Sequence, residues 1–142
     1  MNPRVKRRVL FLCIGNSCRS QMAEGFARKY GEDVMIAASA GLAPALGVAQ
    51  DTVRTMDEKN INVRDHFPKS IHQLGRAQFD LIVNMSGFTL PEDVVTPTRH
   101  WDVQDPIGED YKTYCNVRDQ IEALVMALIL ELRRAENDDA QP

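Results

Sequence analysis

The chain has 142 residues, of which 44% are hydrophobic, and a formal net charge of −3 at pH 7. This length supports one domain with one core and excludes two ordinary domains. The slightly acidic balance argues against a nucleic-acid or anionic-membrane partner. The chain has three cysteines, no signal-peptide pattern and no apolar run of the roughly twenty residues that span a bilayer, which predicts a cytoplasmic protein.

In chain order, the first half predicts two strand–helix units. The continuous apolar run at residues 9–13 is typical of a strand buried on both faces, and a helix is expected over residues 20–30, where Gly31 ends it. Residues 34–38 predict a second strand. After a loop, apolar residues at helical spacing predict a second helix that begins near residue 49 and ends near residue 60.

The second half predicts two further strands and a long terminal helix. Residues 79–84 and 99–101 are the expected strands, residues 116–134 the helix, and residues 136–142 a frayed polar tail. Alternating strands and helices predict a doubly wound α/β fold with a parallel sheet, in which ligands bind at the carboxyl ends of the strands. We expect a single domain over residues 1–135.

The most specific pattern lies where the first strand meets the first helix. Cys13 ends the strand, and Arg19 follows six positions later at the mouth of the helix. Such a turn points backbone N–H groups and the positive end of the helix dipole into one cup, which suits a tetrahedral oxyanion. These charges favour a thiolate at Cys13, the predicted nucleophile. Arg19 is predicted to hold two oxyanion oxygens with its planar fork.

The remaining loop residues complete the predicted oxyanion site. Gly15 permits a sharp turn, while the short side chains of Asn16 and Ser17 can satisfy loop amides locally. We assign oxyanion binding to Ile14, Gly15, Asn16, Ser17, Cys18 and Ser20. The loop lacks the Gly-Lys-Ser/Thr ending of a nucleotide P-loop, and the chain lacks the second ligand pair of a zinc site. We therefore expect no metal and no cofactor.

Residues 13–25 read Cys-Ile-Gly-Asn-Ser-Cys-Arg-Ser-Gln-Met-Ala-Glu-Gly. This segment resembles the signature loop of the low-molecular-weight protein-tyrosine phosphatases and of the arsenate reductases that share their fold. A Ser-Ala-Gly triplet at residues 39–41, His66 and an Asp-Pro pair at residues 105–106 follow in the family's order. The resemblance spans nearly the whole chain and implies a three-layer α/β/α fold around a four-stranded parallel sheet.

Hydrolysis of a phosphate ester also needs a proton donor for the leaving oxygen. Asp105 is the best candidate because Pro106 stiffens the backbone after it. From the residues alone, Asp102, Glu109 and Asp110 compete with it. The resemblance to the family's general-acid loop favours Asp105, which would protonate the leaving group and then activate water.

The same resemblance implies a network that holds the loop in its anion-binding shape. Ser39 and His66 occupy the family's loop-supporting positions, beside Asn16 and Ser20. A simple helix N-cap explains Ser20 equally well.

The two other cysteines have different expected roles. Cys18 can form a reversible disulfide with Cys13 and so shield it from over-oxidation. Cys115 is expected to be a structural or surface thiol. Reductases that relay thiols internally carry further cysteines just after the third strand, and residues 83–88 of this chain contain none.

Three functions stay open. Hydrolysis of phosphotyrosine or another phosphate monoester through a Cys13 thiophosphate is slightly favoured, because nucleophile, arginine and acid are all present. In the phosphatases that the chain resembles, aromatic residues that bind phosphotyrosine follow the Asp-Pro pair, whereas Ile107 and Gly108 stand there in this chain. Arsenate reduction is the alternative, with thioredoxin, glutaredoxin or a small thiol as donor. A non-catalytic oxyanion or redox sensor is the third. The expected partners are therefore an oxyanion substrate, a phosphotyrosine protein or a thiol donor.

Overall fold

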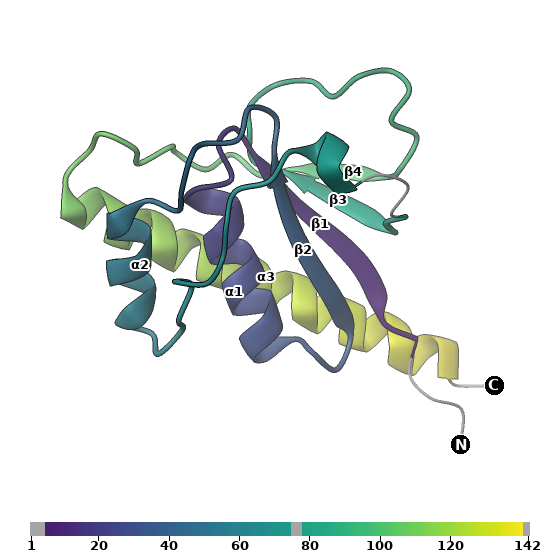
Figure 1. Ribbon diagram of the computed structural model, residues 1–142. Helices are drawn as coiled ribbons and strands as arrows, with labels where there is room; N and C mark the ends of the chain where they lie inside the picture. Colours follow the sequence, from purple (N-terminus) through teal and green to yellow (C-terminus); the bar gives the residue numbers. More distant parts are fainter. Residues whose placement is uncertain (1–4, 75–77, 141–142) are drawn as a thin grey trace.

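The computed structural model describes residues 5–74 and 78–140 and contains one four-stranded sheet (Figure 1). All neighbouring strands are parallel, in the order β2-β1-β3-β4. The strands are β1 (Arg7–Cys13), β2 (Met35–Gly41), β3 (Leu81–Asn84) and β4 (Thr98–His100). The expected α/β class and four-stranded parallel sheet are confirmed.

The strand register brings three strand ends to one edge of the sheet. Cys13 pairs with Gly41 of β2, and Leu12 pairs with Asn84 of β3. The N–H of Met85, just after β3, donates to Leu12 O at 2.7 Å. Because β1 lies between β2 and β3, segments from both neighbours flank the residues that follow Cys13.

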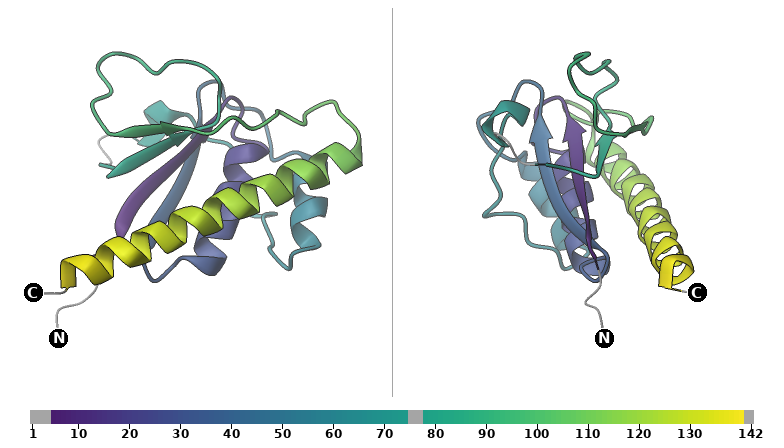
Figure 2. Two further views of the ribbon diagram at one scale, coloured as in Figure 1. Left: turned by 180° about the vertical axis from the view of Figure 1, so that it is seen from behind. Right: turned by 90° about the vertical axis from the view of Figure 1, so that its right-hand side faces the viewer.

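The two faces of the sheet are covered differently. Alternate residues of β1, including Val9 and Phe11, join the larger apolar core with α1 (Arg19–Tyr30) and α3 (Tyr111–Ala140). The other face, with Leu10 and Leu12, packs against loop residues and the short 3₁₀ helix η1 (Ile71–Leu74). Figure 2 shows α3 running along the sheet on the side opposite η1. The layer on this second face is thus built from η1 and loops, not from a long helix.

The terminal helix is longer than expected at both ends. It begins at Tyr111 because Asp110 caps it: the Oδ1 atom of Asp110 accepts hydrogen bonds from the N–H and the hydroxyl of Thr113, at 2.9 and 2.6 Å. It continues to Ala140, so the prediction of a frayed tail is wrong for residues 136–140, which contain no glycine or proline to stop a helix. Residues 141 and 142 lie outside the described residues.

The second helix, α2 (Gln50–Asp57), is shorter than predicted and follows an extended segment after β2. That segment, residues 42–49, runs beside the loop that connects β1 to α1. Within the described ranges, no helix has both the length and the apolar character needed to cross a bilayer.

Candidate active site

Cys13 lies at the base of the loop between β1 and α1, with a side chain that is 3% exposed. Its Sγ is 2.9 Å from Ser20 Oγ, and Ser20 Oγ in turn accepts a hydrogen bond of 2.7 Å from Asn16 Nδ2. The amide donor on Ser20 Oγ leaves the serine hydroxyl hydrogen available to Sγ. Ser20 can therefore donate a hydrogen bond to the Cys13 sulfur. The helix N-cap is Cys18 rather than Ser20.

The backbone of the loop is held from outside by residues 42–49. Four loop carbonyls each accept a hydrogen bond of 2.9–3.1 Å from an N–H of that segment; the pairs are Cys13–Leu42, Ile14–Ala43, Gly15–Ala45 and Ser17–Ala49. No hydrogen bond among the described residues is donated by the backbone N–H groups of residues 15–18. With the carbonyls bound from outside, these N–H groups can serve an oxyanion in the cup.

The loop reaches this shape through two further anchors. Asn16 has a φ of 50°, a left-handed conformation that asparagine tolerates, and its Oδ1 accepts the N–H of Lys69 at 3.0 Å. Thr52 of α2 donates from Oγ1 to Ser17 O at 3.0 Å. Contacts from several distant segments therefore fix the loop backbone.

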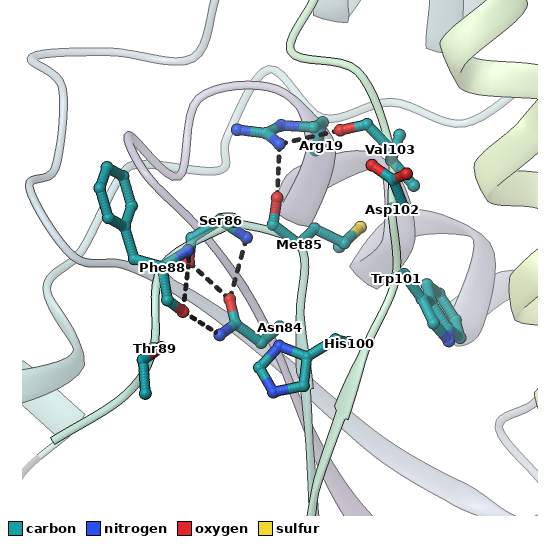
Figure 3. Close-up of a pocket in the computed structure, with 11 residues that line it drawn as sticks. Arg19, Asn84, Met85, Ser86, Phe88, Thr89, His100, Trp101, Asp102 and Val103 are labelled. Atoms are coloured by element: carbon teal, nitrogen blue, oxygen red, sulfur yellow. Dashed lines mark hydrogen bonds between the residues drawn. The ribbon is translucent and has the colours of Figure 1, made fainter.

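Arg19 opens α1 and is 5% exposed (Figure 3). Its Nη1 donates to two carbonyl oxygens, that of Met85 after β3 and that of Val103 after β4, the latter at 3.0 Å. Its Nη2 lies 3.7 Å from Asp105 Oδ2. One nitrogen therefore positions the guanidinium, and the other faces the site.

Asp105 approaches the same cup from the loop after β4. Its Oδ1 accepts the N–H of Ile107 at 3.1 Å, a local turn that orients the carboxylate. A pocket of about 220 Å³ is lined by Cys13, Ile14, Gly15, Ser17, Cys18, Arg19, Ala45, Asp105 and Ile107. The structure thus places the predicted nucleophile, arginine and acid around one small pocket.

Comparison with known proteins agrees with this geometry. The family model described as "Low molecular weight phosphotyrosine protein phosphatase" matches residues 8–138. The chain belongs to this family. Arsenate reductase 1 of Bacillus cereus is 36% identical over 124 residues, which cover 84% of this chain and 92% of the relative.

Solved structures extend the likeness to two activities within the fold. An arsenate reductase in the phosphate-binding state superimposes with a TM-score of 0.82 and 31% identity, covering 89% of this chain and 98% of that one. A structure of the YwlE arginine phosphatase gives a TM-score of 0.73 and 27% identity, covering 89% and 95%. The chain is therefore similar in structure to proteins that carry either name.

The two predicted supporting residues of this family member are placed differently. His66 reaches the loop indirectly: its Nδ1 is 2.9 Å from Gln21 Oε1, and Gln21 Nε2 donates to Asn16 O at 3.1 Å. Burial lowers the pKa of His66, and the nearby Glu24 carboxylate opposes that shift. Ser39 is fully buried, but within the described residues its hydroxyl has no hydrogen-bond partner.

Sequence analysis did not single out Gln21, although it is fully buried and bridges His66 to the loop. The sequence feature that could have indicated this role is an amide side chain directly after Arg19 and Ser20, in the first turn of α1. Thr52 was missed too, because nothing local links it to Ser17.

The other cysteines lie in unlike surroundings. Burial raises the pKa of Cys18 to about 12, so its thiol stays protonated near neutral pH and is a poor attacking group for a disulfide with Cys13. Cys115 contacts Thr55 of α2 and Glu58, which directly follows α2, with S–O distances of 3.5 and 3.7 Å, and does not line the Cys13 pocket. In the described part of the chain, no group of three metal-ligating side chains occurs.

Gly41 should be intolerant of any side chain. A Cβ there would lie 2.6 Å from Ile14 O and 2.9 Å from Asn16 N, both backbone atoms. We expect Gly41→Ala to displace the loop, to weaken phosphate binding about tenfold and to cost about 1–3 kcal/mol of stability. Calorimetric titration with phosphate and thermal unfolding measure both effects. Gly47→Ala is the matched control, because a Cβ there meets nothing within 4 Å; equal losses in the two variants would contradict the close-approach argument.

Proposed function

We propose that the protein reduces arsenate to arsenite, with Cys13 as nucleophile and an external thiol as electron donor. The main support is the similarity to arsenate reductases over most of the chain, together with a small pocket that gathers Cys13, Arg19 and Asp105. This reverses the order in which the sequence alone ranks hydrolysis and reduction.

Binding and the first chemical step follow from the site. The free loop N–H groups and Arg19 hold the arsenate oxygens. The Cys13 thiolate attacks arsenic, and a hydroxyl group of the arsenate leaves as water after it receives one proton from Asp105. The product is a Cys13–S–As(V) adduct whose remaining oxygens stay in the cup.

The electrons must then come from outside the chain. Cys18 is held as a thiol by burial, and Cys115 does not line the pocket. Residues 83–88, just after the third strand, contain no cysteine. Thioredoxin, glutaredoxin or a small thiol is the proposed donor class.

Hydrolysis of phosphate monoesters is the second candidate. It is favoured by the position of Asp105, whose carboxylate lines the same pocket as Cys13 and lies 3.7 Å from Arg19. The YwlE arginine phosphatase shares the fold at 27% identity. No aromatic side chain lines the described pocket, so we do not expect a preference for phosphotyrosine.

The deciding experiment assays purified protein for arsenite formation, with thioredoxin, glutaredoxin and small thiols supplied separately, and in parallel for p-nitrophenyl phosphate hydrolysis. Donor-dependent arsenite formation is the expected result. Hydrolysis without arsenite formation would instead establish a phosphatase. Phosphate binding without either turnover would leave the oxyanion or redox sensor as the function.

Asp105→Asn tests the proposed proton donor. We expect hydrolysis of phenyl phosphate, which has a poor leaving group, to fall about a hundredfold, and hydrolysis of p-nitrophenyl phosphate to fall much less. Steady-state kinetics with both esters measure the difference. Glu109→Gln on the same loop is the control and should leave both rates near wild type; equal slowing of both esters by Asp105→Asn would assign the proton to another group.

A further inference from the structure

A second pocket, whose lining residues are drawn in Figure 3, shares Arg19 with the Cys13 pocket. Its volume is about 440 Å³, twice that of the Cys13 pocket. Pockets for small organic ligands usually occupy about 300–1,000 Å³. The larger pocket therefore has room for an organic molecule, whereas the smaller one suits an oxyanion.

The floor of this second pocket is fixed by internal hydrogen bonds. Asn84 Oδ1 accepts the N–H and the hydroxyl of Ser86 at 2.9 and 2.6 Å, and Asn84 Nδ2 donates to Phe88 O at 2.8 Å. The carbonyls of Met85 and Val103 are occupied by Arg19. These groups shape the pocket but have little bonding capacity left for a ligand.

Three polar side chains that line the pocket keep their bonding capacity. Among the described residues, the side chains of Thr89, His100 and Asp102 form no hydrogen bond or ion pair. Asp102 contributes only its backbone oxygen, which accepts from Gln120. Val103 accepts a hydrogen bond from Arg19 through its carbonyl oxygen, and Asp102 directly precedes it. The unpaired carboxylate of Asp102 is suited to a cationic group on a ligand.

The floor also lies next to the nucleophile. Met85 follows β3, which pairs directly with β1, and its N–H donates to the oxygen of Leu12, the residue before Cys13. A molecule in this pocket would therefore sit one strand away from Cys13, next to the Arg19 side chain that also lines the Cys13 pocket.

We propose that this pocket binds the reducing agent as a small thiol that carries an ammonium group, with Asp102 as the partner of the ammonium. The inference rests on the proposed arsenate reduction. That reaction has two substrates, an oxyanion and a thiol. The smaller pocket fits the oxyanion, the larger pocket fits the thiol, and Arg19 lines both pockets.

The chemistry balances with two molecules of this thiol. The thiolate of the first attacks Cys13 Sγ in the Cys13–S–As(V) adduct, so an S–S bond forms and the S–As bond breaks. The electron pair of that S–As bond stays on arsenic, which leaves as arsenite. A second thiolate attacks the donor sulfur of the mixed disulfide and releases the Cys13 thiolate together with the donor disulfide.

A binding measurement tests the site directly. Trp101 lines the pocket and is the single tryptophan of the chain, so its fluorescence reports an occupant. Titration with 2-(methylthio)ethylamine, which keeps the ammonium but cannot react, should change the fluorescence of the wild type in a saturable way. Asp102→Asn should weaken this binding about fivefold, the upper range for an exposed ion pair. A wild type that shows no saturable change would overturn the proposal.

A kinetic ratio tests it during turnover. The kcat/KM for cysteamine divided by that for neutral mercaptoethanol, measured in each variant, cancels changes in the arsenate step. We expect Asp102→Asn to lower this ratio about fivefold and Asp93→Asn, an exposed control outside the pocket, to leave it unchanged. Arsenite formation with an unchanged ratio in Asp102→Asn contradicts the donor site alone. A wild type that forms no arsenite with any thiol contradicts the proposed function itself.

Discussion

Replacing Cys13 by serine should abolish arsenate reduction and ester hydrolysis, with a loss of at least about a thousandfold, while phosphate still binds. A serine hydroxyl is a far weaker nucleophile than a cysteine sulfur. The loop N–H groups and Arg19 do not depend on the sulfur and should continue to hold the oxyanion. Arsenite release, p-nitrophenol release and calorimetric phosphate binding measure the three properties.

Cys115→Ser is the matched control for this prediction, because the chemical change is the same and the residue does not line the pocket. It should keep both activities near wild type. Residual turnover in Cys13→Ser that exceeds about a tenth of wild type would remove Cys13 from the nucleophile's role.

Arg19→Lys should reduce kcat/KM for arsenate by about a hundredfold to a thousandfold, the range seen when a group that stabilises transition-state charge is lost. The guanidinium bridges Met85 O, Val103 O and the Asp105 carboxylate at once. One ammonium cannot keep both carbonyls and also present two parallel donors to an oxyanion. An unsatisfied buried carbonyl should also cost about 1–3 kcal/mol of stability, seen as a lower midpoint in thermal unfolding.

Arg28→Lys on the same helix is the comparison, because the side chain of Arg28 is 59% exposed and, within the described residues, its ion pair is with Glu24 one turn away. It should leave kcat/KM nearly unchanged. If the two lysine variants lose activity equally, the effect comes from the helix as a whole and not from the anchored guanidinium.

The sequence predicts the fold and the reactive groups because both depend on local patterns. The apolar run before Cys13, the spacing to Arg19 and the Asp105–Pro106 turn are each readable within a few residues. The structure gathers these three side chains in one pocket. Their catalytic roles are the part that the variants above test.

The sequence fails where contacts join distant segments or where a stop signal is absent. The hydrogen bonds from residues 42–49 to the loop carbonyls join backbone atoms only, so no residue type in the sequence predicts them. The closeness of Gly41 to Ile14 depends on strand register. The predicted end of α3 is too early because polar residues alone do not end a helix, and no glycine or proline occurs between Tyr111 and Ala140.

The backbone hydrogen bonds that hold the loop open have a consequence for selectivity in a mixture of anions. An oxyanion loop whose shape is set by residues 42–49 selects ligands by their size and charge, and arsenate and phosphate are alike in both. Such a site cannot choose between them on binding. Under the proposed reduction, selectivity would arise at the later step, in which only arsenic accepts an electron pair. For an arsenate reductase of this design, cellular phosphate acts as a standing competitor. The working rate then follows the ratio of the two anions rather than the arsenate concentration alone.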